Sequence, residues 1–198
     1  MSHRFKETYH FWTIVEKWYV SKFQRCFDLC CRMIDMKVDS VIIHDIRSTH
    51  NVGSILRTCD GFGVRRVYIG GISPYPSVPG DTRLPHISAK LTKDIKKTAL
   101  GAEETIEIIP YSDIYDLINQ LKDRSISVVA LEQTPNSIHL GDFELSSPMS
   151  LLLGCEVEGV DAEIINLCSH AVEIPMVGQK ESFNVSVATG IALYALCT

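Results

Sequence analysis

The chain has 198 residues, with 19 Lys and Arg against 24 Asp and Glu, and a formal net charge of −5 at pH 7. Its composition, with 45 % hydrophobic and 22 % charged residues, is ordinary for a folded chain, and its length is enough to bury a substantial core. Both exclude wholesale disorder. The net negative charge also argues against a protein that coats nucleic acid by bulk electrostatics. Residues 1–100 nevertheless carry 16 basic and 9 acidic side chains, whereas residues 101–198 carry 3 and 15. This asymmetry suggests an anionic partner for the first half, although basic side chains on solvated helix faces are the simpler explanation.

The first 38 residues differ from the rest in composition. They hold both tryptophans, three of the seven cysteines, and no glycine or proline. We therefore predict an N-terminal helical segment over residues 1–38, followed by one domain over residues 39–198.

Beyond this segment, short apolar runs alternate with helical patterns. The predicted strands lie at residues 41–43, 67–69, 105–109, 126–131, 150–153 and 172–174. The predicted helices lie at residues 51–62, 87–100, 113–122, with Ser112 as its cap, and 182–196. Strands that are apolar throughout and separated by helices indicate an α/β fold with a parallel sheet covered on both faces.

The cysteine pattern indicates the compartment. The seven cysteines form neither a CxxC pair nor a zinc-ligand pattern, so we expect free thiols and no metal. No stretch approaches the roughly 18 apolar residues of a membrane span, and Glu16 and Lys17 interrupt the apolar N-terminus. We expect a cytoplasmic protein with no membrane partner.

Three segments that follow predicted strands are candidates for a binding site: residues 51–57, 153–159 and 174–188. The carboxyl ends of strands are where open α/β sheets bind ligands, and a glycine-containing strand-to-helix turn offers backbone N–H groups to an anion. Taken singly, each segment has a structural explanation: Ser182 as a helix cap, Glu156 as the partner of that cap, and Arg57 as a surface residue.

Together the three segments resemble, in order and character, the motifs of the SpoU/TrmH family of RNA 2′-O-ribose methyltransferases, within the SPOUT superfamily. The matched positions are Asn51, Gly53 and Arg57 (N-x-G-x-x-x-R), Gly154, Glu156 and Gly159 (G-x-E-x-x-G), and residues 174–188 (I-P-M-x-G-x-x-x-S-L-N-V-S-V-A). Phe183 stands where the third motif has leucine. The resemblance covers residues 40–196.

The resemblance implies a parallel sheet flanked by helices with a C-terminal trefoil knot, a homodimer, and S-adenosylmethionine as cofactor. By motif position, the residues around the cofactor would be Leu131, Gly154, Ile174, Met176, Ser182 and Phe183. The catalytic set would be Arg57, Asn51, Glu156, Ser182 and Asn184. Because a guanidinium stays protonated, Arg57 suits a phosphate clamp that stabilises the developing alkoxide better than a general base.

An RNA partner would meet the basic half of the chain. The candidate RNA-binding residues are His50, Arg65, Arg66, Arg83, His86, Lys90, Lys93, Lys96 and Lys97. For His50, a structural role at the helix entry is an equal alternative. Among structured RNAs, we expect tRNA rather than rRNA as substrate.

Two other functions are open on the sequence alone. One is a methyltransferase of the same knotted fold that acts on a base nitrogen, and the other is a non-catalytic RNA-binding dimer. The Asn51/Arg57 pair and the Ser182/Asn184 pattern favour ribose chemistry.

Overall fold

The computed structural model describes residues 37–144, 148–155 and 157–198. Most of the helical segment predicted over residues 1–38 lies outside this part of the chain, and so does Glu156. The residues from Lys37 to Thr198 form one compact unit.

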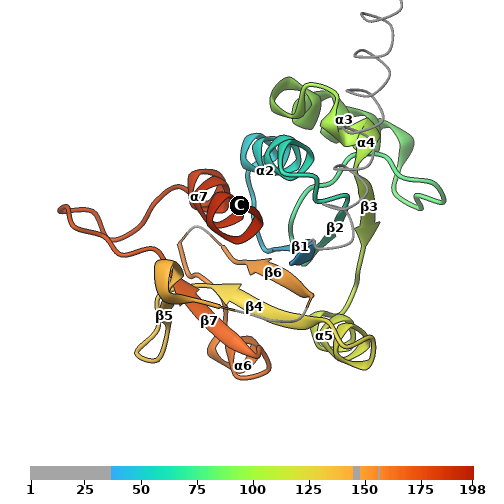
Figure 1. Cartoon of the computed structure of the whole chain (residues 1–198). Coiled ribbons are helices and arrows are strands. Elements are labelled where there is room, and N and C mark those ends of the chain that lie inside the picture. Colours follow the sequence, from blue (N-terminus) through green and yellow to red (C-terminus); the bar gives the residue numbers. More distant parts are fainter. Residues whose placement is uncertain (1–36, 145–147, 156) are drawn as a thin grey trace, which may run out of the picture. The chain divides into compact units, whose positions relative to one another are not determined.

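A parallel sheet runs through this unit, as the sequence predicts (Figure 1). Its order is β3-β2-β1-β6-β4-β7-β5, and every pairing is parallel. The strands are β1 (Val38–His44), β2 (Arg66–Gly70), β3 (Glu107–Pro110), β4 (Ser127–Leu131), β5 (Ile138–His139), β6 (Met149–Leu153) and β7 (His170–Glu173). The chain builds β1, β2 and β3 outward in order, and the later β6 then pairs with the other edge of β1.

Helices cover both faces of the sheet (Figure 1). They are α2 (Thr49–Gly61), α3 (Pro85–Ala99), α4 (Ala102–Thr105), α5 (Ile114–Asp123), α6 (Ala162–Ile165) and α7 (Val185–Cys197), with a 3₁₀ turn η1 (Leu140–Asp142). Helices α2, α3 and α7 share one core with Val41 and Ile43, whereas α5 and α6 share the other with Ile42. Neighbouring residues of β1 thus serve opposite cores, as the alternation of side chains along a strand requires.

Helices α2 and α5 follow apolar spacing of three and four residues. In α2 the buried face is Val52, Ile55, Leu56 and Cys59, and Ser48 caps the helix by accepting from the Asn51 amide at 3.3 Å. Such a stripe places every apolar side chain on one side of the helix, against the sheet.

Several predicted boundaries were wrong. Asp113, not Ser112, caps α5, because its carboxylate accepts from the amides of Tyr115 and Asp116. The last helix begins at Val185 rather than Ser182, and Asn184 is its cap. The predicted strand over residues 105–109 begins two residues later, since the preceding residues form α4.

The described cysteines, Cys59, Cys155, Cys168 and Cys197, are free. Burial raises the pKa of the Cys59 thiol well above its ordinary value, so this cysteine behaves as an apolar core residue. Among the described helices, none is long and apolar enough to cross a membrane.

Candidate functional site

A cleft of about 330 Å³ lies where β4, β6 and β7 end. Three segments form its walls: the residues after β4, the turn after β6, and the long segment between β7 and α7. Five of the six predicted cofactor residues line it, namely Leu131, Gly154, Ile174, Ser182 and Phe183. Met176, the sixth, is half-buried and is not among the described residues that line the cleft.

Acidic side chains that the motifs did not indicate also line this cleft. They are Glu132, Glu158, Glu173 and Glu181. Glu173 is held at the rim, where one oxygen lies 3.0 Å from His139 Nε2 and the other accepts from Ser137 Oγ at 2.7 Å. A cleft that combines apolar side chains with acidic ones suits an amphipathic ligand that carries positive charge.

The turn after β6 is closed by two backbone hydrogen bonds, from Cys155 N to Gly159 O at 3.1 Å and from Gly159 N to Cys155 O at 3.0 Å. Gly159 has φ +71°, a left-handed conformation that favours glycine. The second glycine of the G-x-E-x-x-G motif is therefore explained by the turn that forms one wall of the cleft.

A hydrogen bond joins motif one to motif three. Asn184 Nδ2 donates to Asn51 Oδ1 at 3.3 Å, although the two residues are 133 positions apart. Asn184 Oδ1 meanwhile accepts from the Ser186 amide at 2.9 Å and from Ser186 Oγ at 2.6 Å. The first turn of α2 and the cap of α7 are thus joined by predicted site residues.

Gly53 does not form the anion-binding turn that the sequence suggested. It lies within α2, where a Cβ would come 2.2 Å from Thr98 Oγ1 and 2.4 Å from the Ile95 carbonyl oxygen of α3. Thr98 Oγ1 also donates to the His50 carbonyl at 3.0 Å. The glycine of motif one therefore allows α2 and α3 to approach each other closely.

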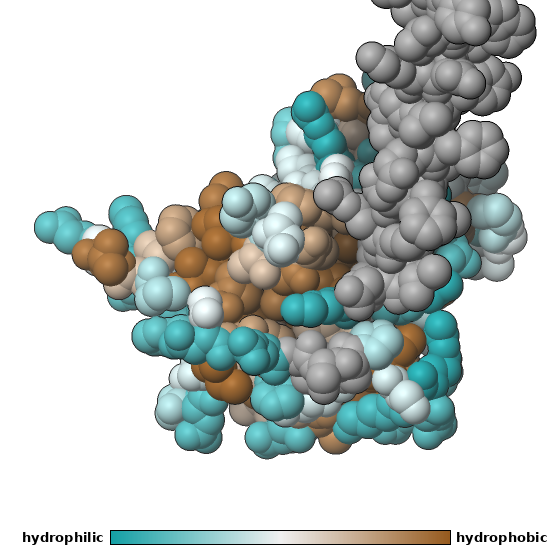
Figure 2. All heavy atoms as spheres, viewed as in Figure 1, coloured by the Kyte–Doolittle hydropathy of each residue, from teal (hydrophilic) through white to brown (hydrophobic). Residues whose placement is uncertain are grey.

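Arg57 lies apart from the cleft, in a second, open hollow between α2 and α7. The hollow has a volume of about 680 Å³ and is lined by Arg57, Thr58, Gly61, Phe62, Val187, Gly190, Ile191 and Tyr194. Its floor is mainly apolar, and Figure 2 shows hydrophobic side chains gathered over α7. Helix α7 separates the two depressions, because Val185 and Ala188 line the cleft while Val187 and Ile191 line the hollow.

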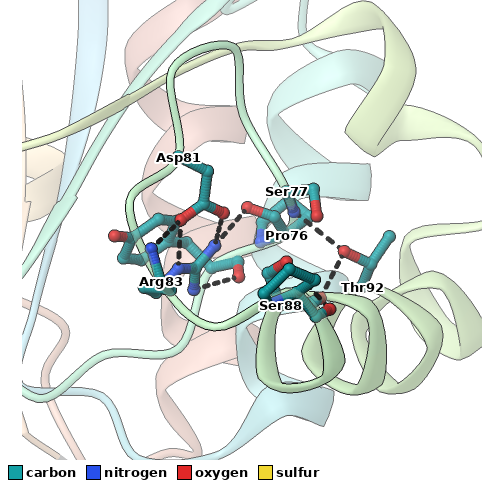
Figure 3. Close-up of polar contacts among 8 residues, drawn as sticks. Pro76, Ser77, Asp81, Arg83, Ser88 and Thr92 are labelled. Carbon is teal, nitrogen blue, oxygen red and sulfur yellow. Dashed lines mark hydrogen bonds and ion pairs between the residues drawn. The ribbon is translucent and has the colours of Figure 1, made fainter.

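Arg83, predicted to bind RNA, is engaged inside the segment between β2 and α3 (Figure 3). Its guanidinium lies 2.5 Å from Asp81 Oδ2, donates to the carbonyls of Tyr75 and Pro76, and stacks 3.5 Å from the Tyr75 ring centroid. Hydrogen bonding to Arg83 lowers the pKa of Asp81 to about 2. Arg83 thus holds the segment in shape and has few donors left for a phosphate.

The other predicted RNA-binding residues divide into two groups. Arg66 pairs with Asp39 and Glu107, Lys97 with Asp94, and Lys96 with Glu103 and Glu104. The remaining side chains are exposed, and they are His50, Arg65, His86, Lys90 and Lys93. The sequence shows which side chains are charged but not which of them pair in the folded chain. It therefore could not distinguish the paired basic residues from the others.

Comparison with known proteins agrees with this architecture. The family model described as the SpoU rRNA Methylase family matches residues 81–194. The chain is 33 % identical over 168 residues to the 23S rRNA (guanosine-2′-O-)-methyltransferase RlmB of Pectobacterium atrosepticum. This alignment covers 84 % of this chain and 63 % of that protein. The chain is 29 % identical over 154 residues to the tRNA (guanosine(18)-2′-O)-methyltransferase of Aquifex aeolicus, covering 78 % of this chain and 66 % of that protein.

A solved structure shares the fold. The crystal structure of the A. aeolicus TrmH/SpoU tRNA modifying enzyme superposes with a TM-score of 0.65 at 26 % identity, covering 84 % of this chain and 78 % of that one. The chain spans slightly less than two thirds of the two relatives named above. With a family model that matches more than half of its residues, the chain belongs to the SpoU rRNA methylase family.

Proposed function

We propose that this chain transfers a methyl group from S-adenosylmethionine to a ribose 2′-hydroxyl of structured RNA. The observation that carries the proposal is the cleft, because five residues at motif positions for the methyl donor come together there. The relatives support the same reaction class, since both are named guanosine 2′-O-methyltransferases.

The residues of the cleft fit this donor. Its volume of about 330 Å³ falls within the range of about 300–1,000 Å³ that is usual for small-molecule sites. Leu131, Ile174 and Phe183 offer apolar surface for an adenine ring, while Glu158 and Glu181 offer negative charge to a sulfonium and an ammonium group. When bound there, S-adenosylmethionine supplies an electrophilic methyl group.

Arg57 is our candidate for the residue that acts on the RNA. Its forked, cationic guanidinium suits a clamp for phosphate that also stabilises negative charge developing on the 2′-oxygen. In the single chain its side chain is exposed on α2, where it lines the hollow between α2 and α7. In this proposal it is an electrostatic catalyst and not a proton acceptor. The proton of the 2′-hydroxyl passes to solvent water as its oxygen takes the methyl group, and S-adenosylhomocysteine is released.

Asn51, Asn184 and Ser182 orient the reacting groups. The hydrogen bond between Asn51 and Asn184 holds the start of α2 against the cap of α7, and Ser182 lines the cleft two residues earlier. Glu156 is assigned to the same set by motif position. Orientation of this kind supplies much of the acceleration of a group transfer.

The RNA is proposed to lie along the exposed basic side chains of α2 and α3. Lys90 and Lys93 on α3, His50 on α2 and Arg65 after it are the candidates. Phosphate contacts of this kind position a folded RNA without reading its sequence. We favour tRNA over rRNA as the substrate and a cytoplasmic location for the protein.

A homodimer with a C-terminal trefoil knot completes the proposal. The apolar hollow of α2 and α7 exposes Val187, Ile191 and Tyr194, side chains that a second copy of the chain would cover. Such a dimer would also gather two basic faces on one particle.

The reaction is tested by incubating the protein with methyl-labelled S-adenosylmethionine and either tRNA or rRNA. Digestion of the product distinguishes the chemistry, since a 2′-O-methyl group makes the adjacent phosphodiester resistant to alkali. Label in alkali-resistant dinucleotides of tRNA is the expected result. Label in alkali-released mononucleotides would indicate base methylation and overturn the proposal. Absence of both transfer and donor binding would overturn it as well, in favour of a non-catalytic RNA-binding protein.

A further inference from the structure

The two residues that follow β4, Glu132 and Gln133, connect the separate walls of the cleft. Glu132 Oε2 accepts from the Val160 amide at 3.0 Å, which ties it to the turn after β6. Gln133 Nε2 donates to the Glu181 carbonyl at 3.1 Å, which ties it to the segment before α7. Both residues also line the cleft themselves. One dipeptide therefore contacts both of the other walls.

The Glu132 carboxylate is fixed at both of its oxygens. While Oε2 binds the Val160 amide, Oε1 accepts from the Gln133 amide at 3.0 Å. The Glu132 backbone N–H in turn donates to the Val172 carbonyl at 2.9 Å, so its main chain is tied to β7. Hydrogen bonds to an ionised carboxylate are stronger than those between neutral groups. The side chain thus has one well-defined position beside the cleft.

Gly159 makes room for this carboxylate. A Cβ at Gly159 would lie 2.4 Å from Glu132 Oε2, and the residue already has φ +71°. The close approach places Glu132 directly against the turn that carries Gly154 and Cys155. Glu132 and Gly159 are therefore matched to each other in shape, one on the segment after β4 and the other on the turn after β6.

We propose that Glu132 and Gln133 are positioning residues that set the geometry of the methyl-donor cleft, Glu132 through the Val160 amide and Gln133 through the Glu181 carbonyl. The proposal rests on the function proposed above. Walls formed by three separate loops need such connections to be preorganised for a ligand, and preorganisation lowers the cost of binding. No motif of the sequence indicated either residue.

Binding of the donor is the first measurement. In titration calorimetry of the full chain with S-adenosylmethionine, Glu132→Ala should raise Kd about ten-fold or more, because a charged hydrogen bond contributes about one factor of ten or above. Gln133→Ala removes an exposed neutral bond and should raise Kd about three-fold. KM for the donor should rise in both variants while kcat at saturating donor changes less, as expected for residues that do not touch the reacting atoms.

A second measurement needs no ligand. In hydrogen exchange of the free protein, Glu132→Ala should speed exchange at the Val160 amide, whereas Gln133→Ala should leave it unchanged. Gly159→Ala should weaken donor binding less in the Glu132→Ala background than in the wild type, since the clash with the carboxylate is then absent. This coupling separates the proposed contact from a general loss of stability.

Asn136→Ala is the matched control, because Asn136 is exposed on the same segment. It should bind the donor as the wild type does. If Glu132→Ala does not fold, Glu132→Gln, which keeps the shape and loses one acceptor, replaces it. Wild-type protein that does not bind S-adenosylmethionine overturns the proposed function itself. Wild-type protein that binds it, together with a folded Glu132 variant of unchanged Kd and unchanged Val160 exchange, overturns the positioning role alone.

Discussion

Arg57 is the residue on which the proposed chemistry depends most directly. Because it lines the hollow of α2 and α7 and the methyl donor is assigned to the cleft, its effects on catalysis and on donor binding should separate. We expect Arg57→Ala to lower kcat by about 10²–10³-fold, the usual loss for one electrostatic catalyst, with donor Kd unchanged. Single-turnover methyl transfer and titration calorimetry measure the two quantities.

The conservative variant defines the role of Arg57 further. Arg57→Lys keeps the positive charge but loses the two-pronged hydrogen bonding of the guanidinium. If Arg57 clamps a phosphate, this variant should keep partial activity at saturating RNA and have a raised KM for RNA. Near-normal turnover of Arg57→Ala would remove Arg57 from the mechanism.

Asp81 gives a prediction about pH. Its pKa is lowered to about 2 in the folded protein, chiefly by the side-chain hydrogen bond from Arg83, whereas the ordinary value is 3.8. A lowered folded-state pKa contributes stability that is present above the unfolded value and is lost as pH falls through the folded one. Asp81→Asn should therefore destabilise the protein at pH 7, and its difference from wild type should shrink between about pH 4 and pH 2. Urea unfolding across this range measures it, and a pH-independent difference would contradict the pairing.

At the scale of elements, α2 and α3 pack through Gly53. Gly53→Ala should lower the free energy of unfolding by about 1–3 kcal/mol, the usual cost of overpacking, although alanine is the better helix former. Chemical denaturation measures the change. Gly61→Ala in the same helix, where a Cβ meets nothing within 4 Å, should not be destabilising. A stabilising Gly53→Ala would show that the two helices do not need this close approach.

Helix α3 is where the RNA contact is tested. Lys90→Glu and Lys93→Glu together reverse two exposed charges, and they should weaken RNA binding and reduce its salt dependence by about two phosphate contacts. Fluorescence anisotropy across a salt series measures both. Lys97→Glu, whose lysine already pairs with Asp94 at 2.7 Å, should have the smaller effect. Unchanged affinity and slope in the double variant would locate the RNA elsewhere.

The sequence predicted the elements that have a strong local signal. Strands β1, β2, β4 and β6 are apolar runs because a parallel sheet is buried on both faces, and α2 and α5 follow from their spacing. Helices α4 and α6 and strand β5 are too short to show a period. The start of α7 was missed because Ser182 and Asn184 are both good caps, and the hydrogen bond to Asn51, far away in sequence, belongs to Asn184.

The candidate site was predictable to the extent that motifs mark it. Leu131, Gly154, Ile174, Ser182 and Phe183 were assigned by motif position, and they come together only in the folded chain. Glu132 and Gln133 lie outside the motifs, and their one local signal is that polar residues follow a buried strand directly. The packing role of Gly53 and the internal pairing of Arg83 depend on partners that no local pattern contains.

At the scale of the whole molecule, the apolar hollow predicts assembly. Ile191→Glu places a charge in the hollow, so the proposed homodimer should dissociate into single chains in sedimentation velocity. Ala195→Glu, on an exposed position of the same helix outside the hollow, should leave the dimer intact. A wild-type protein that sediments as a single chain at all concentrations would contradict the assembly.

The strand order has a consequence for synthesis on the ribosome. Strands β1 to β3 and helices α2 and α3 are neighbours in the chain as well as in space, so this half can form while the rest is still being translated. The other edge of β1 stays unpaired until β6, more than a hundred residues later in the chain, has been synthesised. The cleft also needs the ends of β4 and β7 and the segment before α7, so it forms only after these later strands have joined the sheet.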